Sequence, residues 1–160
     1  MMRPSTHILA LVALFATLGA TLPALAQSVP SEPGAEVFKR CAACHLANGE
    51  GVPGAFPPLS REPAAFSKSD EGRRYLALAV IRGLSGPLTV EGKPYVGTMP
   101  AQANLDDASV AAVLNYVTGS LAGSTNDAQF TAQEVAAARR AGDGMSATDV
   151  ARLQPKAVPQ

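Results

Sequence analysis

The chain has little of what stabilises or steers many proteins of its size. It contains two cysteines and no tryptophan, and aromatic residues make up 5% of its 160 positions. Two cysteines so close together cannot form a disulfide scaffold. Charge of one sign is also lacking, because 13 basic residues balance 13 acidic ones. Without a basic field, binding to nucleic acid or to anionic lipid is not expected.

Residues 1–26 have the organisation of a secretory signal peptide. Arg3 provides a positive start, Ile8 to Leu22 is uncharged and apolar, and Ala24-Leu25-Ala26 resembles a cleavage site. An uncleaved membrane anchor is the alternative, since the uncharged stretch is nearly long enough to span a bilayer. Pro23 and the Ala-x-Ala ending favour cleavage. We expect export in either case, a short polar linker over residues 27–33, and no membrane span after cleavage.

Both cysteines lie in the pentapeptide Cys41-Ala42-Ala43-Cys44-His45. Cys-x-x-Cys-His is the attachment signature of c-type haem, in which two thioethers tether the porphyrin and the histidine ligates iron. The other histidine, His7, falls in the leader. On a short helix that ends in a turn, the two cysteines point to the same side and the histidine is carried under the ring. One such motif predicts one covalently bound haem c.

Two other uses of the pentapeptide are weaker. Zinc usually takes four Cys or His ligands, and the chain beyond the leader offers three. A thioredoxin-type redox pair would need a βαβ context, whereas the flanks here indicate a helix and a glycine-rich loop.

The second axial ligand is predicted to be Met99. Beyond the leader the methionines are Met99 and Met145. Met99 lies in Gly97-Thr98-Met99-Pro100, a rigid loop from which a thioether could approach the iron face opposite His45. Met145 is interpreted as structural or exposed. A sulfur ligand favours ferrous iron and leaves no open coordination position, which indicates electron transfer rather than catalysis.

The helix pattern surrounds this motif. We expect a first helix from Gly34 to Arg40, an irregular loop over residues 48–58, a second helix from Ser69 or Asp70 to Arg82, and a strong amphipathic helix from Asp106 or Asp107 to Leu121. Residues 84–98 are expected to be loop-like, with a small hairpin at 90–93 that Pro94 keeps short.

A helical extension is predicted beyond Gly123. Thr131 and Glu134 form a capping box for a helix to about Ala141, and Ser146 to Asp149 repeats the pattern for a last turn or two. The extension is interpreted either as a strap over the core or as a docking arm for a redox partner.

On these motifs the chain resembles the class I cytochromes c over roughly Gly34 to Leu121. The resemblance is carried by Cys41, Cys44, His45, Phe56-Pro57-Pro58-Leu59, Met99-Pro100 and the helix around Tyr116. It implies an all-α cytochrome c fold, with three to four core helices around one covalent haem. Residues 34–121 would form the haem domain, and residues 122–160 a linker and the helical C-terminal extension.

The resemblance also implies roles for individual residues. Gly34 and Phe38 would cross the last core helix near Tyr116. The Pro57 carbonyl would accept a hydrogen bond from His45 Nδ1, although Pro57 could also be a plain turn proline. Arg82 and Tyr95 could bond a haem propionate, or Arg82 could belong to a solvated face. The residues expected to line the haem crevice, or simply to fill a core, are Leu59, Leu76, Val80 and Leu88.

More narrowly, the chain resembles soluble cytochrome subunits of bacterial periplasmic dehydrogenases, through Phe56-Pro57-Pro58-Leu59 and Gly86-Pro87-Leu88-Thr89-Val90. The expectation is a periplasmic electron carrier, not itself an enzyme, between a dehydrogenase and an oxidase or another cytochrome. A permanent haem subunit of a multi-subunit oxidoreductase is the alternative. A haem gas sensor, with Met99 displaced by the gas, is a third.

Overall fold

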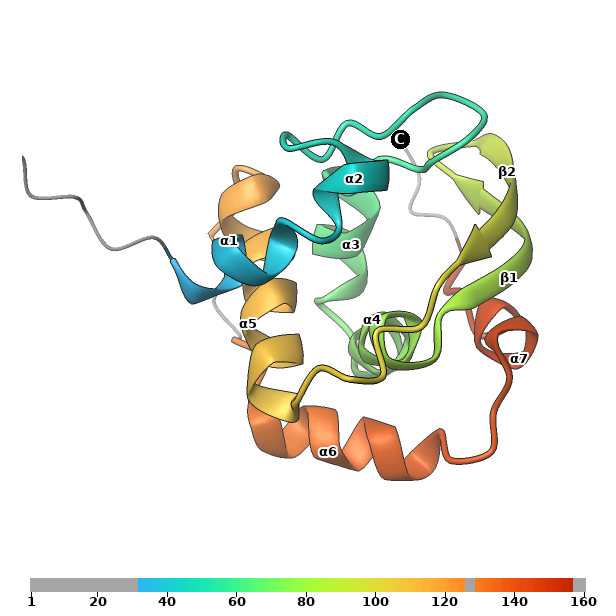
Figure 1. The fold of residues 1–160 in the computed structure, drawn as a ribbon. Coiled ribbons are helices and arrows are strands. Elements are labelled where there is room, and N and C mark those ends of the chain that lie inside the picture. Colours follow the sequence, from blue (N-terminus) through green and yellow to red (C-terminus); the bar gives the residue numbers. More distant parts are fainter. Residues whose placement is uncertain (1–31, 126–128, 157–160) are drawn as a thin grey trace, which may run out of the picture.

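Short helices make up most of the molecule, and a single β-hairpin lies along one side of it (Figure 1). The computed structural model describes residues 32–125 and 129–156, so the predicted signal peptide and most of the predicted linker lie outside the described residues. The elements are α1 (Pro33–Phe38), α2 (Ala42–His45), α3 (Arg61–Phe66), α4 (Asp70–Arg82), β1 (Leu84–Val90), β2 (Lys93–Met99), α5 (Asp107–Tyr116), the π-helical turn η1 (Val117–Leu121), α6 (Ala132–Ala141) and α7 (Ala147–Ala151). Within the described ranges, no helix is both long and apolar enough to cross a membrane.

The two longest predicted helices, α4 and α5, begin at the capping residues predicted for them. Ser69 Oγ accepts a hydrogen bond from Gly72 N at 3.1 Å at the start of α4, and Asp106 Oδ1 accepts one from Ser109 N at 2.7 Å at the start of α5. Gly83 ends α4 in a left-handed conformation, with φ 76°. These boundaries agree with the prediction, and η1 carries the α5 segment on to Leu121.

The crossing of α1 and α5 agrees with the expectation from the resemblance. Gly34 lies against α5 so closely that a Cβ there would be only 2.6 Å from Tyr116 Cβ and closer still to the Ala112 carbonyl oxygen. One turn later, the Phe38 and Tyr116 rings pack with centroids 5.3 Å apart. Because Gly34 has no side chain, α1 and α5 can pack this closely.

The hairpin is longer than predicted, so the loop-like assignment of residues 84–98 was wrong and the fold is not purely helical. β1 and β2 pair over their whole length, from Leu84 opposite Met99 to Val90 opposite Lys93. Glu91 and Gly92 form the turn with φ 51° and 74°, the positive values that tight hairpins require. Pro94 does not shorten the pairing, because β2 has no further neighbour in this two-stranded sheet and an edge strand tolerates a missing N–H.

The C-terminal extension is part of the main core. Figure 1 shows α6 passing beneath α4 and α5, with α7 beside the hairpin. Phe130, Val135 and Val150 are almost fully buried in one cluster with Leu78 of α4, and Met145 packs against it. Thr131 Oγ1 caps α6, and Ser146 and Asp149 form a reciprocal capping box at α7. The contacts agree with the strap interpretation.

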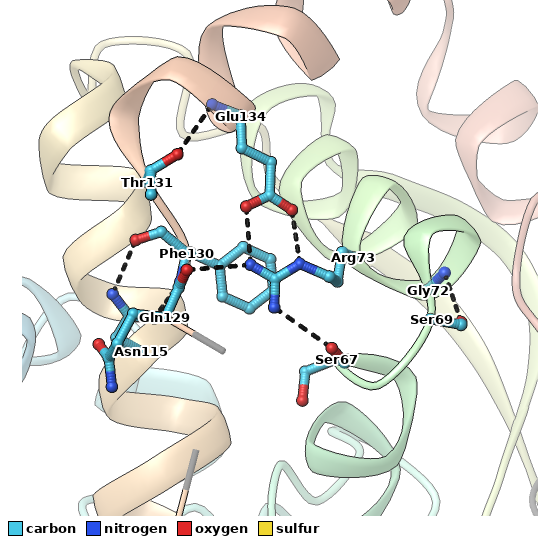
Figure 2. Close-up of polar contacts among 9 residues, drawn as sticks. All are labelled: Ser67, Ser69, Gly72, Arg73, Asn115, Gln129, Phe130, Thr131 and Glu134. Carbon is cyan, nitrogen blue, oxygen red and sulfur yellow. Dashed lines mark hydrogen bonds and ion pairs between the residues drawn. The ribbon is translucent and has the colours of Figure 1, made fainter. Parts of the chain in front are cut away.

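Arg73 of α4 fastens the start of the extension (Figure 2). Its guanidinium forms two hydrogen bonds with the Glu134 carboxylate, at 2.6 and 2.7 Å, and donates to the backbone oxygens of Ser67 and Gln129. The same group lies 3.9 Å from the centre of the Phe130 ring. One side chain thus joins α4, the end of α3 and the first turn of α6.

Candidate haem site

The pentapeptide forms one helical turn. The backbone N–H groups of Cys44 and His45 both donate to the Cys41 carbonyl, at 3.1 and 2.9 Å. The chain leaves this turn through Leu46, which has a φ of 63°. Cys41 and Cys44 are free thiols, and both line the same cavity as His45. The turn therefore presents two sulfurs and one imidazole to a common space, as the motif predicts.

The glycine-rich loop that follows holds the histidine ring. His45 Nδ1 lies 2.8 Å from the Pro57 carbonyl oxygen, the contact expected from the resemblance. Gly51 makes this approach possible: its φ is 66°, and a Cβ there would lie 2.6 Å from the Pro57 oxygen and even closer to the Phe56 oxygen. The density of glycine and proline over residues 48–58 thus folds a loop around one carbonyl.

The hydrogen bond determines which histidine nitrogen can bind a metal. A carbonyl oxygen can only accept, so Nδ1 carries the proton and Nε2 keeps its lone pair. The His45 side chain is buried, and burial lowers its pKa, although the bond to Pro57 opposes that effect. The neutral imidazole needed for iron ligation is therefore the favoured form.

Two adjoining apolar cavities meet at this histidine. Both are lined by Cys41, His45, Pro57, Leu84 and Met99, and the wider of the two has a volume of about 530 Å³. All four predicted crevice residues line the narrower one: Leu59, Leu76, Val80 and Leu88. The space is lined mainly by apolar side chains, with two thiols, a thioether and an imidazole at its wall.

Met99 reaches the cavities from the last position of β2. It is half-buried, and its partner across the hairpin is Leu84 at the start of β1. The predicted loop is thus the end of a strand, where pairing fixes the backbone more firmly than a loop would. Met145 lines neither cavity.

The structure does not favour a redox disulfide or a zinc site at the cysteine pair. Burial raises the pKa of the Cys41 thiol, outweighing the opposing effect of Arg40, whereas reactive redox cysteines need a lowered pKa. Among the described residues, no three His, Cys, Asp or Glu side chains are grouped so that they could hold a metal ion. The donor set of two thiols, an imidazole and a thioether fits a tethered haem.

The structure separates the two predicted propionate partners. Tyr95 is buried and lines the wider cavity with Cys44 and Met99. Arg82 lines neither cavity; its guanidinium donates to Asp143 at 3.0 Å, in a separate surface depression with Arg139. The contact with Asp143 occupies one end of the guanidinium, while Arg82 Nε is buried without a hydrogen-bond partner, and the role of Arg82 toward a propionate stays a prediction.

Two polar residues of the site were not predicted. Glu62 and Tyr75 are both buried and both line the narrower cavity. A glutamate between Arg61 and Pro63 gives no sequence signal of burial, because carboxylates are almost always exposed. Tyr75 was predicted on the second helix without a role.

Comparison with known proteins points to the same kind of site. The model of the family described as Cytochrome c matches residues 31–120. Two relatives named cytochrome c-552, one from Thermus thermophilus and one from a particular strain of that species, are each 42% identical over 109 residues. The matched part covers 64% of this chain, and 80% and 71% of the two relatives.

Proposed function

The chain belongs to the cytochrome c family and carries covalently bound haem c, and we propose that it is a periplasmic carrier of single electrons with His45 and Met99 as axial ligands. Cys41 and Cys44 would hold the two thioether bonds. The observation that carries the proposal is the His45–Pro57 hydrogen bond, since it leaves Nε2 free in a cavity that also contains Met99.

Bound haem supplies a one-electron couple between ferric and ferrous iron. The residues of this chain set the conditions for it. Pro57 holds the His45 ring and raises its basicity as a ligand. Leu59, Leu76 and Val80 keep water out of the cavity, and a low dielectric disfavours the extra charge of the ferric state. The thioether of Met99 acts in the same direction, so a high potential follows.

The opening of the wider cavity supports exchange of electrons with a protein partner. Phe56 and Val96 both line it, and their side chains are 39% and 75% exposed. Exposed apolar side chains at the edge of a cavity are typical of contact surfaces. A dehydrogenase as donor, and an oxidase or another cytochrome as acceptor, would approach the haem here. The apolar rim equally suits a permanent oxidoreductase subunit, the second candidate function.

The proposal is tested on the exported protein expressed with haem-attachment machinery. Pyridine haemochrome spectra should show two thioether bonds in the wild type, and acidified acetone should extract no haem. Replacing Cys44 with Ala should leave one thioether bond, and replacing both cysteines should make all haem extractable. Haem that acetone removes from the wild type would contradict the proposal.

Electron transfer and assembly need a second measurement. The purified protein should cycle between ferric and ferrous spectra with one electron per haem, without binding carbon monoxide rapidly in the reduced state. Rapid carbon monoxide binding would favour the gas-sensor alternative. Purification from the native host as a stoichiometric complex with a dehydrogenase would show a permanent subunit instead of a free carrier.

A further inference from the structure

Glu62 is a buried acid at the haem cavity, and neither haem attachment nor iron ligation uses it. Its side chain is 6% exposed, and it lines the narrower cavity together with His45 and Leu76. Within the described ranges, it is the only acidic residue that is buried. A carboxylate in such a place is costly unless it has a compensating partner.

The partner of Glu62 is a backbone group, not a cation. Glu91 N, at the tip of the hairpin, donates to Glu62 Oε1 at 2.7 Å. No lysine or arginine bonds to Glu62 among the described hydrogen bonds and ion pairs. The bond fixes the carboxyl group at the cavity wall, and it brings the acidic side chain of Glu91 nearby.

Few titratable groups face this carboxyl. Helix α4 and η1 pack against α3, and the hairpin tip bonds to it. Among the described residues, the titratable groups that interact with the Glu62 carboxyl are Tyr75 of α4 and Glu91 of the tip, and η1 has no titratable residue. Burial and the charge of Glu62 both raise the pKa of Tyr75, which stays neutral. Gln154, which lines the same cavity, is neutral as well.

The protonated form of Glu62 is favoured by its surroundings. Burial raises the pKa of its carboxyl above the usual 4.5; the hydrogen bond from Glu91 N opposes this, and the charge of Glu91 adds to it. The pKa of the Glu62 carboxyl therefore lies above that of an exposed glutamate.

We propose that Glu62 is a proton acceptor coupled to electron uptake. When the haem gains one electron from the donor, the Glu62 carboxylate binds one proton from solvent and becomes a neutral carboxylic acid; on oxidation the electron leaves and the proton returns to solvent. The inference rests on the proposed position of the haem in this cavity.

Coulomb's law gives the sign of the coupling. An added electron makes the cavity more negative, and in a low dielectric this raises the proton affinity of the carboxylate. By reciprocity, the proton on Glu62 raises the electron affinity of the haem by the same factor. The midpoint potential should therefore fall as pH rises through the titration of Glu62, and this residue should add no slope below or above that window.

The test is the midpoint potential of the holoprotein from about pH 4 to about pH 8, a range that brackets a raised glutamate pKa. Three proteins are compared: the wild type, Glu62→Gln, and Glu71→Gln as a control for an exposed glutamate on α4. Glutamine keeps the oxygen that accepts the Glu91 hydrogen bond, so the hairpin stays attached. The haem carboxylates are present in all three, so their contribution cancels in the comparison.

We expect the Glu62→Gln variant to lose the downward slope and to keep, across the window, the higher potential that the wild type shows at low pH. The Glu71→Gln control should retain the wild-type curve. A Glu62→Gln variant with normal haem spectra and an unchanged slope would overturn the inference while leaving the proposed function intact. Absence of covalent haem from the wild type would overturn both.

A second measurement covers the case in which the variant does not fold. Redox-difference infrared spectra of the wild type, with ¹³C at the glutamate side-chain carboxyls, should show a protonated-carboxyl band that grows on reduction and shifts with the label. Unlabelled 5-aminolaevulinate supplied during expression keeps the haem carboxylates unlabelled, so that their bands do not shift. A difference spectrum without such a band across the same pH range would overturn the inference.

Discussion

Met99 and Met145 differ in role because they lie in different parts of the structure. Both pack against the main core, but Met99 ends β2 at the wall of the haem cavities, whereas Met145 precedes α7 and lines neither cavity. Their side chains are identical, and a methionine is usually a core filler. The sequence indicated Met99 as the iron ligand because Pro100 follows it and because no second histidine follows the leader. The structure adds that hairpin pairing with Leu84 holds Met99 in place.

Replacing Met99 with Ala should open one axial position of the iron. Without the soft ligand, the midpoint potential should fall by on the order of 0.1–0.3 V, a fraction of the roughly 0.8 V range that axial ligands span. External imidazole should then bind the ferric protein. Potentiometric titration and ferric absorption spectra measure both effects.

The control for Met99→Ala is Met145→Leu, which changes a thioether outside both cavities. Its potential and spectrum should equal those of the wild type. Equal potentials for Met99→Ala and the wild type would exclude Met99 as an iron ligand.

At the scale of elements, helices were easier to predict than the hairpin. Capping residues such as Ser69 and Asp106 act locally, so the sequence pattern specifies where α4 and α5 begin. The hairpin depends on pairing between residues up to fifteen positions apart, from Leu84 to Met99. Two prolines and three glycines obscured its strand pattern. The contact that completes it, from Glu91 N to Glu62, lies outside the hairpin altogether.

The contact between α1 and α5 gives a prediction at this scale. In Gly34→Ala the new Cβ would overlap the Ala112 carbonyl, a backbone atom that cannot swing away. Overpacking of this kind should lower the free energy of unfolding by about 1–3 kcal/mol. Denaturant titration of the holoprotein measures the loss.

The matched control is Gly97→Ala. A Cβ at Gly97 would have no heavy atom within 4 Å, and its backbone is not left-handed. The change in unfolding free energy should stay within about 0.5 kcal/mol. If both variants lost the same stability, close packing would not be the reason for glycine at position 34.

At the scale of the whole molecule, the C-terminal extension completes the core. The haem-attachment motif could be predicted from local sequence, because the pentapeptide itself fixes the spacing of Cys41, Cys44 and His45. Burial of Val135 and Val150 in the same core as Leu78 of α4 could not, because the sequence of a helix does not specify which distant helix its apolar face will meet. The extension also reaches the site, since Gln154 donates to the Thr89 carbonyl at 2.8 Å and lines the narrower cavity.

Substitution of Arg73 tests whether its contacts with the C-terminal extension stabilise the molecule. In Arg73→Ala, Glu134 loses a partner whose own side chain is only 11% exposed, and Phe130 loses the guanidinium over its ring. Breaking a mostly buried pair should cost about 3 kcal/mol of unfolding free energy. Denaturant titration measures this, and protease cleavage between α5 and α6 should become faster.

Lys39→Ala is the control for Arg73→Ala, because the Lys39–Glu36 pair is exposed and local, with 71% and 49% of the two side chains accessible. Its unfolding free energy should change by less than about 0.5 kcal/mol. The haem spectra of both variants should remain normal in the folded state, since neither residue lines the cavities. If Arg73→Ala lost no more stability than Lys39→Ala, the Arg73–Glu134 pair would not be among the contacts that stabilise the extension on the core. Arg73 would then orient α6 without stabilising it.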